Sequence, residues 1–277
     1  MQISNNRLNR NDPMNIQDRI ELEIDQHIAI VRFNRPEKMN ALDMPTFAAL
    51  HDVQEQIAGN SDIRAVVLTA AGEHFCAGLD VQGVMADPSA VEKLLSKDEE
   101  KGWLGNYVQQ VVVGWQQLEV PVIAALNGYV FGGGFQIALG ADFRITHPQS
   151  QLSVMEIRWG IIPDMGISVV GASIAAKDQL KLLAMTGKRI SGEEAQQMGL
   201  STQLAVHPES AAIELARTIA SNNPDAVRGV KSLFNAEHSA ATDSLAQEEA
   251  LQRTLLFSPN QIEAVQANLQ KRAPEFK

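Results

Sequence analysis

Apolar and polar residues alternate in two short segments near the N-terminus, residues 20–24 and 29–33, with the polar residues 25–27 between them. A period of two residues is typical of strands that bury one face. The pattern therefore predicts an early β-hairpin.

A helical period follows the hairpin. Within residues 44–57, the apolar side chains that recur at helical spacing are Phe47, Leu50, Val53 and Ile57. Gly59 ends the run, as glycine commonly does after a helix. A second stripe of this kind covers residues 104–118. The segment 82–102 is polar and charged without a clear period, and we predict a mobile loop with some helix there.

Two continuous apolar segments, residues 65–69 and 121–126, are typical of strands covered on both faces. Each runs into a glycine-containing turn, at residues 70–80 and 127–134, and a helical segment follows the second turn at residues 135–139. Repeated strand–turn–helix units predict an α/β core whose working edge lies at the carboxyl ends of the strands.

The pattern changes after residue 205. Helices are predicted at residues 208–220, 224–238, 244–257 and 259–271. Three of these segments carry proline in the first turn, where it is well tolerated. The last helices have apolar residues on several faces, which favours packing against another subunit as well as the core. We therefore divide the chain into a polar N-terminal tail (1–18), a core (19–205) and a C-terminal helical region (206–277).

Composition narrows the function classes. The chain has 33 acidic and 23 basic residues, and its formal net charge is −10. This charge argues against a nucleic-acid partner. No apolar run reaches the ~18–20 residues of a membrane span, and residues 1–18 lack the apolar segment of a secretory signal. The single cysteine, Cys76, rules out an internal disulfide, so we expect a cytoplasmic protein. A buried apolar role for Cys76 is favoured over a catalytic thiol, and the scattered histidines predict no metal site.

Several common ligand motifs are missing. The segment 132–137 lacks the third glycine of a dinucleotide fingerprint, residues 187–189 lack the flanking residues of a P-loop, and no Gly-x-Ser-x-Gly occurs. The two glycine turns remain. Glycine at a strand end lets the backbone approach a ligand, and two N–H groups from separate turns can stabilise the oxyanion of an enolising thioester. The alternative is that Gly132-Gly133-Gly134 only makes a tight turn.

Four motifs in order and register resemble the crotonase (enoyl-CoA hydratase/isomerase) family. They are Arg-Pro-Glu-Lys-Met-Asn-Ala-Leu at 35–42, Phe-Cys-Ala-Gly-Leu-Asp-Val at 75–81, Asn-Gly-Tyr-Val-Phe-Gly-Gly-Gly at 127–134, and Glu156 followed by Gly-Ile-Ile-Pro at 160–163. The resemblance extends from about Arg19 to the C-terminus. It implies a crotonase-like (ββα) spiral core with a C-terminal helical trimerisation region, and a homotrimer or dimer of trimers.

The resemblance also implies the ligand and its contacts. The substrate is an acyl-CoA thioester, with no further cofactor because coenzyme A is part of the substrate. The oxyanion-hole N–H groups fall on Ala77 and Gly133. Lys38, with Arg32 or Arg35, is a candidate for the CoA phosphates, and Arg228 can add charge. The substrate- and CoA-binding candidates are Lys38, Met39, Ala41, Ala77, Gly78, Leu79, Asp80, Val81, Gly133 and Lys231.

Hydratases of this family hold water between two glutamates. The second corresponds to Glu156, but the first position is occupied by Gln136, an amide that cannot exchange a proton at neutral pH. Asp164 stands where dienoyl-CoA isomerases of the family place an acid, although a turn-forming role after proline is the alternative. The apolar residues around Glu156 predict a raised carboxyl pKa; they are Met155, Ile157, Trp159, Ile161 and Ile162.

One carboxylate suffices for a 1,3-proton shift. We therefore predict an enoyl- or dienoyl-CoA isomerase in which Glu156 carries the proton, Asp164 is a second acid/base and Gln136 forms hydrogen bonds without taking part in proton transfer. A 2-enoyl-CoA hydratase, in which Gln136 positions a water, is the first alternative. A non-catalytic CoA-binding protein is the second.

Overall fold

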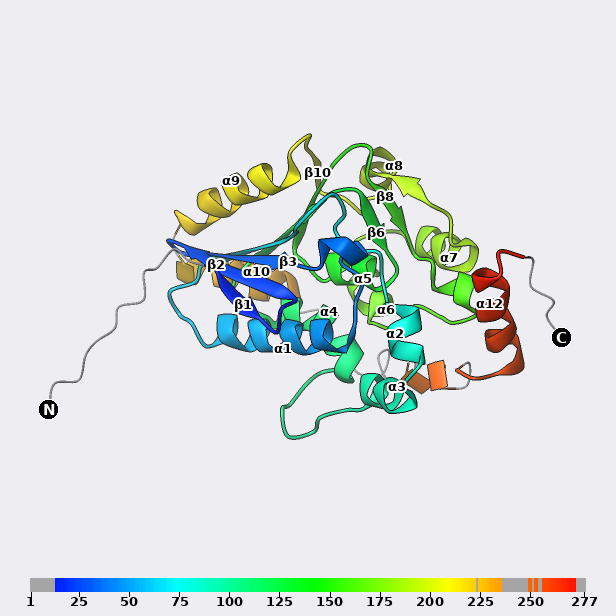
Figure 1. The fold of residues 1–277 in the computed structure, drawn as a ribbon. Coiled ribbons are helices and arrows are strands. Elements are labelled where there is room, and N and C mark those ends of the chain that lie inside the picture. Colours follow the sequence, from blue (N-terminus) through cyan, green and yellow to red (C-terminus); the bar gives the residue numbers. More distant parts are fainter. Residues whose placement is uncertain (1–12, 223, 236–248, 251, 254–255, 273–277) are drawn as a thin grey trace, which may run out of the picture.

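The computed structural model describes residues 13–222, 224–235, 249–250, 252–253 and 256–272. Two sheets form its core (Figure 1). The larger one contains, in spatial order, β1 (Met14–Ile16), β2 (Ile20–Asp25), β3 (Ile28–Phe33), β4 (Ala65–Ala70), β5 (Val122–Leu126), β7 (Phe143–Thr146) and β10 (Gln203–Leu204). The smaller one contains β6 (Tyr129–Phe131), β8 (Gln151–Ser153) and β9 (Ile190–Ser191).

The predicted hairpin is confirmed. Strands β2 and β3 pair antiparallel, and every pairing from β3 through β4, β5 and β7 to β10 is parallel. Strand β1 pairs with β2 in the register Met14 to Leu22, so the sheet begins inside the segment 1–18 that was predicted to be a tail. The tail boundary at residue 18 is therefore wrong, and residues 1–12 lie outside the described part of the chain.

The described helices lie around the two sheets, and some of them pack on the faces of the larger one. They are η1 (Pro36–Lys38), α1 (Met44–Ala58), α2 (Val81–Met85), α3 (Pro88–Leu95), α4 (Tyr107–Gln117), α5 (Gly133–Leu139), η2 (Glu156–Trp159), α6 (Ile167–Val170), α7 (Lys177–Thr186), α8 (Gly192–Gln197), α9 (Pro208–Ala220), α10 (Pro224–Asn235) and α12 (Pro259–Leu269). Figure 1 shows α9 on one side of the sheet and α1 with α4 on the other. Ala212 and Ala216 of α9 are buried against the sheet residues Val67 and Ile123, because small side chains let a helix lie close to a sheet.

The segment 82–102 was predicted to be a mobile loop with some helix, and α2 and α3 occupy much of it. Asp80 begins α2 by accepting from the Gly83 N–H at 3.2 Å, and Asp87 begins α3 by accepting from the Ser89 N–H at 2.9 Å. Each helix is short, so its apolar residues make too few repeats to reveal a period. Among these residues, Leu94 and Leu95 are buried.

The C-terminal helices α9, α10 and α12 confirm three of the four helical segments predicted after residue 205. Within the fourth, residues 249–250 and 252–253 are helical and most of the remainder lies outside the described residues. None of the described helices is long and apolar enough to cross a bilayer.

Candidate active site

The two glycine turns predicted from the sequence lie side by side. The Cys76 N–H donates to the Tyr129 carbonyl at 3.0 Å, and the Cys76 carbonyl accepts from the Phe131 N–H at 2.9 Å. Further along, φ is +90° at Gly78 and +52° at Gly132, a region that favours glycine. A Cβ on Gly78 would lie 3.0 Å from the Phe131 carbonyl oxygen. The close approach of the two turns therefore requires glycine.

The first turn offers a different N–H from the one predicted. The Ala77 N–H donates to the Met39 carbonyl at 2.9 Å, so the prediction that Ala77 is an oxyanion donor is wrong. The Gly78 carbonyl accepts from the Leu42 N–H at 2.8 Å. In a trans peptide the N–H points opposite to the preceding C=O, so the Leu79 N–H points away from Leu42. The described residues supply no acceptor for it.

The second turn presents the N–H of Gly133. As the first residue of α5, Gly133 has no intrahelical acceptor for its N–H, and none occurs elsewhere among the described residues. The preceding N–H, of Gly132, donates to the Ser153 carbonyl at 2.9 Å. Leu79 and Gly133 line the same pocket.

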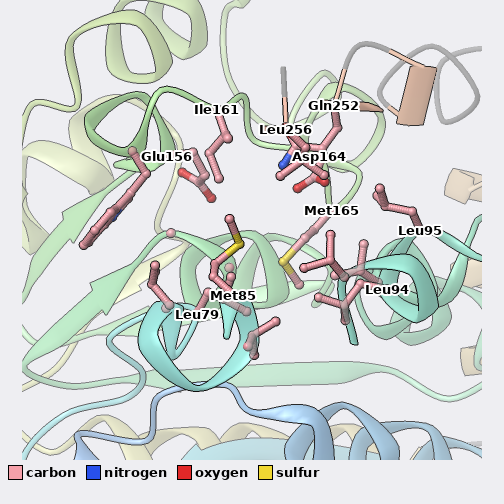
Figure 2. Close-up of a pocket in the computed structure, with 18 of the residues that line it drawn as sticks. Leu79, Met85, Leu94, Leu95, Glu156, Ile161, Asp164, Met165, Gln252 and Leu256 are labelled. Atoms are coloured by element: carbon pink, nitrogen blue, oxygen red, sulfur yellow. The ribbon is translucent and has the colours of Figure 1, made fainter. Parts of the chain in front are cut away.

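This pocket is apolar except for three side chains. Its walls come from α2, α3, α4, η2 and residues 161–165, and Leu256 of the C-terminal region closes one side. Glu156, Asp164 and Gln252 supply the polar groups. Figure 2 shows the Glu156 and Asp164 carboxylates pointing into the pocket, with leucine and methionine side chains of α2 and α3 opposite.

Glu156 is held by the amide of Gln136. The Gln136 Nε2 donates to the Glu156 Oε1 at 2.7 Å, and the Gln136 Oε1 accepts from the Met165 N–H at 3.1 Å. The second contact fixes which end of the amide faces Glu156, because a backbone N–H needs an oxygen opposite it. The Glu156 Oε2 is buried and has no hydrogen-bond partner among the described residues.

Burial raises the pKa of the Glu156 carboxyl to about 7, and the hydrogen bond from Gln136 opposes part of that rise. The apolar neighbours predicted from the sequence include Met155, Trp159 and Ile161, which line the pocket, whereas Ile157 is 41% exposed. A carboxyl with such a pKa can both accept and return a proton near neutral pH.

Cys76 lies behind the first turn. Its side chain is fully buried and burial raises its pKa to about 12, so the buried apolar interpretation is confirmed and a catalytic thiol is not. Among the described residues, no group of three or more His, Cys, Asp or Glu side chains is arranged to hold a metal ion.

A family model for enoyl-CoA hydratase/isomerase matches residues 23–277. The chain belongs to this family. It is 33% identical over 258 residues to the short-chain-enoyl-CoA hydratase of Clostridium acetobutylicum, covering 92% of this chain and 95% of that protein. It is 26% identical over 268 residues to the peroxisomal Δ(3,5)-Δ(2,4)-dienoyl-CoA isomerase of Arabidopsis thaliana, covering 93% and 95%.

Solved structures agree with this assignment. The enoyl-CoA hydratase of Bacillus anthracis superposes with a TM-score of 0.72 at 31% identity, covering 93% of this chain and 98% of that one. An enoyl-CoA hydratase/isomerase of Pseudoalteromonas atlantica gives a TM-score of 0.82 at 24% identity, over 93% and 99%, which supports the crotonase-like fold alone.

The residues near the N-terminus that were proposed to bind CoA differ in exposure and in ion pairing. Lys38 and Met39 are exposed on and after η1, and Ala41 is partly buried. Arg35 is paired with Asp80 at 3.0 Å, and Arg32 is paired with Glu209. These two arginines are therefore not free to bind phosphate as the sequence suggested.

Lys231 is a structural residue. Its Nζ donates to the Trp115 and Val120 carbonyls, both at 2.9 Å, and pairs with Asp142 at 2.8 Å. Only 5% of its side chain is exposed, and burial lowers its pKa, opposed by Asp142. The prediction that Lys231 binds CoA is therefore wrong. Arg228 lies 3.8 Å from Glu119.

The first-turn residues divide into two groups. Ala77, Gly78, Leu79 and Val81 line the pocket, whereas the Asp80 carboxylate caps α2 and binds Arg35. Sequence reasoning missed Gln252 and Leu256, which also line the pocket. Both residues lie in the segment 244–257 that was predicted to be a helix, and no local pattern signals that Gln252 contacts Ile162.

Proposed function

We propose that this chain shifts a double bond of an enoyl- or dienoyl-CoA by moving a proton along the acyl chain. Glu156 removes a proton from the carbon next to the thioester, and the electron pair moves onto the thioester oxygen. The N–H groups of Leu79 and Gly133 stabilise that enolate oxygen. Return of a proton to the carbon two positions further along in a 3-enoyl chain, or four positions further along in a 3,5-dienoyl chain, restores the carbonyl and moves each double bond by one position.

The observation that carries this proposal is the pairing of one buried carboxyl with an amide. Glu156 has a pKa of about 7, its Oε2 has no partner within the described part of the chain, and its hydrogen-bonding neighbour is Gln136. Hydratases of the family hold the water between carboxyls at positions 136 and 156, where one group activates the water and the other delivers a proton. An amide does neither at neutral pH. Asp164 on the same pocket wall is the second acid/base of the proposal.

Hydration of a 2-enoyl-CoA is the alternative, supported by the 33% identity to a short-chain-enoyl-CoA hydratase. In that reaction Gln136 would have to hold the attacking water. One N–H of its amino group donates to Glu156 and its carbonyl oxygen accepts from Met165, so the water would have to use the remaining N–H or lone pair. A non-catalytic role as a CoA-binding protein is disfavoured because the Glu156 carboxylate faces the pocket (Figure 2).

The coenzyme A portion is proposed to leave the pocket past the first turn and to meet Lys38. Lys38 is exposed and has no ion-pair partner among the described residues. Phosphate groups favour such a cation. We also infer a trimer or dimer of trimers, supported by the 78% exposed Phe234 and the 55% exposed Val230 on α10; a stable monomer at micromolar concentration in light scattering contradicts it.

The reaction is tested by incubating the purified protein with 3-enoyl-CoA, 3,5-dienoyl-CoA and 2-enoyl-CoA in water enriched in ¹⁸O. Mass spectrometry separates the two chemistries, because an isomer keeps the substrate mass and a hydrated product gains one labelled water. We expect isomerisation without ¹⁸O, and loss of turnover by at least ~100-fold in Glu156→Gln. Faster hydration than isomerisation, or full activity in Glu156→Gln, overturns the proposal.

A further inference from the structure

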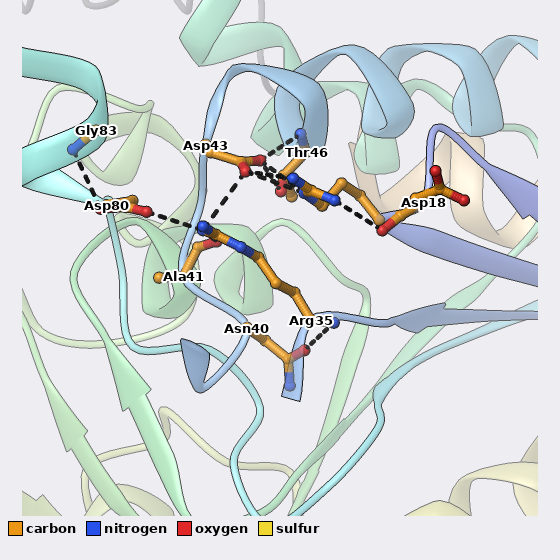
Figure 3. Close-up of polar contacts among 9 residues, drawn as sticks. Asp18, Arg35, Asn40, Ala41, Asp43, Thr46, Asp80 and Gly83 are labelled. Atoms are coloured by element: carbon orange, nitrogen blue, oxygen red, sulfur yellow. Dashed lines mark hydrogen bonds and ion pairs between the residues drawn. The ribbon is translucent and has the colours of Figure 1, made fainter. Parts of the chain in front are cut away.

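Arg35 lies at the junction of three segments that surround the first turn (Figure 3). Its Nη1 donates to the Asp80 Oδ2 at 3.0 Å and to the Ala41 carbonyl at 3.0 Å, and lies 3.5 Å from the Asp43 Oδ2. Only 14% of its side chain is exposed. The guanidinium is therefore enclosed by one carbonyl and two carboxylates.

The two carboxylates begin two different helices. Asp43 accepts from the Thr46 N–H at 2.9 Å at the start of α1, and Asp80 accepts from the Gly83 N–H at 3.2 Å at the start of α2. Arg35 thus links the N-terminus of α1 to the N-terminus of α2, the short helix that lines the pocket.

Between these two caps the backbone is paired. The Leu42 N–H donates to the Gly78 carbonyl at 2.8 Å, and the Asp80 N–H donates to the Leu42 carbonyl at 2.9 Å. This pairing sets the plane of the peptide between Gly78 and Leu79, and hence the direction of the Leu79 N–H. Arg35 contacts the residues on either side of Leu42 and the residue after Leu79.

Arg35 is itself held in place. Its N–H donates to the Asn40 Oδ1 at 2.8 Å, and the Asn40 Nδ2 donates to the Ala71 and His74 carbonyls at 2.9 and 2.8 Å. Asn40 is 2% exposed. The network therefore runs from the end of β4 to the start of α2 without a break.

We propose that Arg35 is a positioning residue that aims the Leu79 N–H at the thioester oxygen. Its charge holds Ala41, Asp43 and Asp80 together, so the pairing between residues 41–43 and 78–80 keeps one geometry when the oxygen becomes negative. The proposal rests on the proposed function. It assigns to Arg35 an effect on the electric field at the carbonyl of the bound thioester, in addition to any effect on folding.

Arg19 provides a matched control. It binds the same Asp43 through Nε at 3.1 and 3.0 Å and through Nη2 at 2.9 Å, but the structure gives it no contact with Asp80 or Ala41. Arg19→Met and Arg35→Met therefore remove equal charges from one network, and only the second releases the first turn.

The readout is the infrared stretch of a ¹³C-labelled thioester carbonyl in bound hexanoyl-CoA, a saturated ligand that has no double bond to move. Polarisation by the two N–H groups lowers this frequency. We expect Arg35→Met to lose most of the shift and to lower kcat at least ~10-fold, since misdirected donors stabilise the transition state poorly. KM is expected to change little, and Arg19→Met to keep both the shift and kcat.

If Arg35→Met does not fold, Asp80→Asn provides a second test. Asparagine caps a helix as well as aspartate does, but the ion pair with Arg35 is lost. A full carbonyl shift and wild-type kcat in folded Arg35→Met or Asp80→Asn, or an equal loss in Arg19→Met, overturns the role of Arg35. Absence of any shift in the wild-type protein instead contradicts the proposed oxyanion hole.

Discussion

The Gln136 amide donates to one oxygen of Glu156 at 2.7 Å and leaves the other oxygen, Oε2, without a partner among the described residues. The donated hydrogen bond makes Oε1 an acceptor in both protonation states. A proton carried by the carboxyl therefore resides on Oε2. This asymmetry suits a carboxyl that accepts and returns one proton from one direction.

Replacing the amide by an acid tests this relationship. Gln136→Glu places two carboxyl groups in contact, so one pKa rises and the other falls. We expect hydration of 2-enoyl-CoA to rise at least ~10-fold relative to isomerisation, because one group can then activate water while the other delivers a proton. Incorporation of ¹⁸O from labelled water measures the ratio.

Gln136→Met is the control for that variant, since it removes the amide without adding an acid. It is expected to slow isomerisation and to produce no hydration. Equal ¹⁸O incorporation in the Glu and Met variants contradicts the role given to Gln136.

The free energy of unfolding should decrease as the pH rises, because of Glu156. The folded pKa of about 7 lies above the ordinary value of 4.5, so its stabilising contribution is complete below pH 4.5 and is lost as pH rises through 7. Between pH 5 and 8 the wild-type protein is expected to lose about 2 kcal/mol relative to Glu156→Gln. Urea unfolding of both proteins at the two pH values measures this, and parallel pH dependence contradicts a raised pKa.

Lys231→Met should destabilise the fold and leave coenzyme A binding intact. The variant removes the cation that pairs with Asp142 and donates to the Trp115 and Val120 carbonyls. The free energy of unfolding is expected to fall by on the order of 3 kcal/mol. Urea unfolding and KM are measured together. Lys188→Met is the control, because that pair with Glu194 is exposed and contributes at most about 1 kcal/mol. A raised KM with unchanged stability would restore a role in CoA binding.

Gly78→Ala should impair catalysis by displacing the first turn. The residue has φ of +90°, and its Cβ would lie 3.0 Å from the backbone oxygen of Phe131, so the two turns must separate. We expect kcat to fall at least ~10-fold and stability to fall by about 1–3 kcal/mol. In Gly59→Ala the new Cβ meets its nearest atom at 3.4 Å, and near-normal activity is expected. Wild-type kcat in Gly78→Ala is inconsistent with a donor at Leu79.

Local patterns in the sequence located the glycine turns, Glu156 and three of the C-terminal helices. Glycine spacing, a carboxyl among apolar neighbours, and proline at helix starts are each properties of a few consecutive residues. The same reasoning predicted some helix between residues 82 and 102 but did not locate α2 and α3, whose starts depend on single capping aspartates.

Sequence alone thus determined the family, the two turns, the acid at position 156 and the amide at position 136, since these follow from residue types at fixed spacings. Tertiary structure decided which N–H of the first turn is free, because pairing with Met39 and Leu42 orients those peptides. It also decided that Lys231 is a buried structural cation, because its partners come from segments about 90 to 116 residues away. Hydrogen bonds between distant segments are set by how the whole chain packs, which no local pattern records.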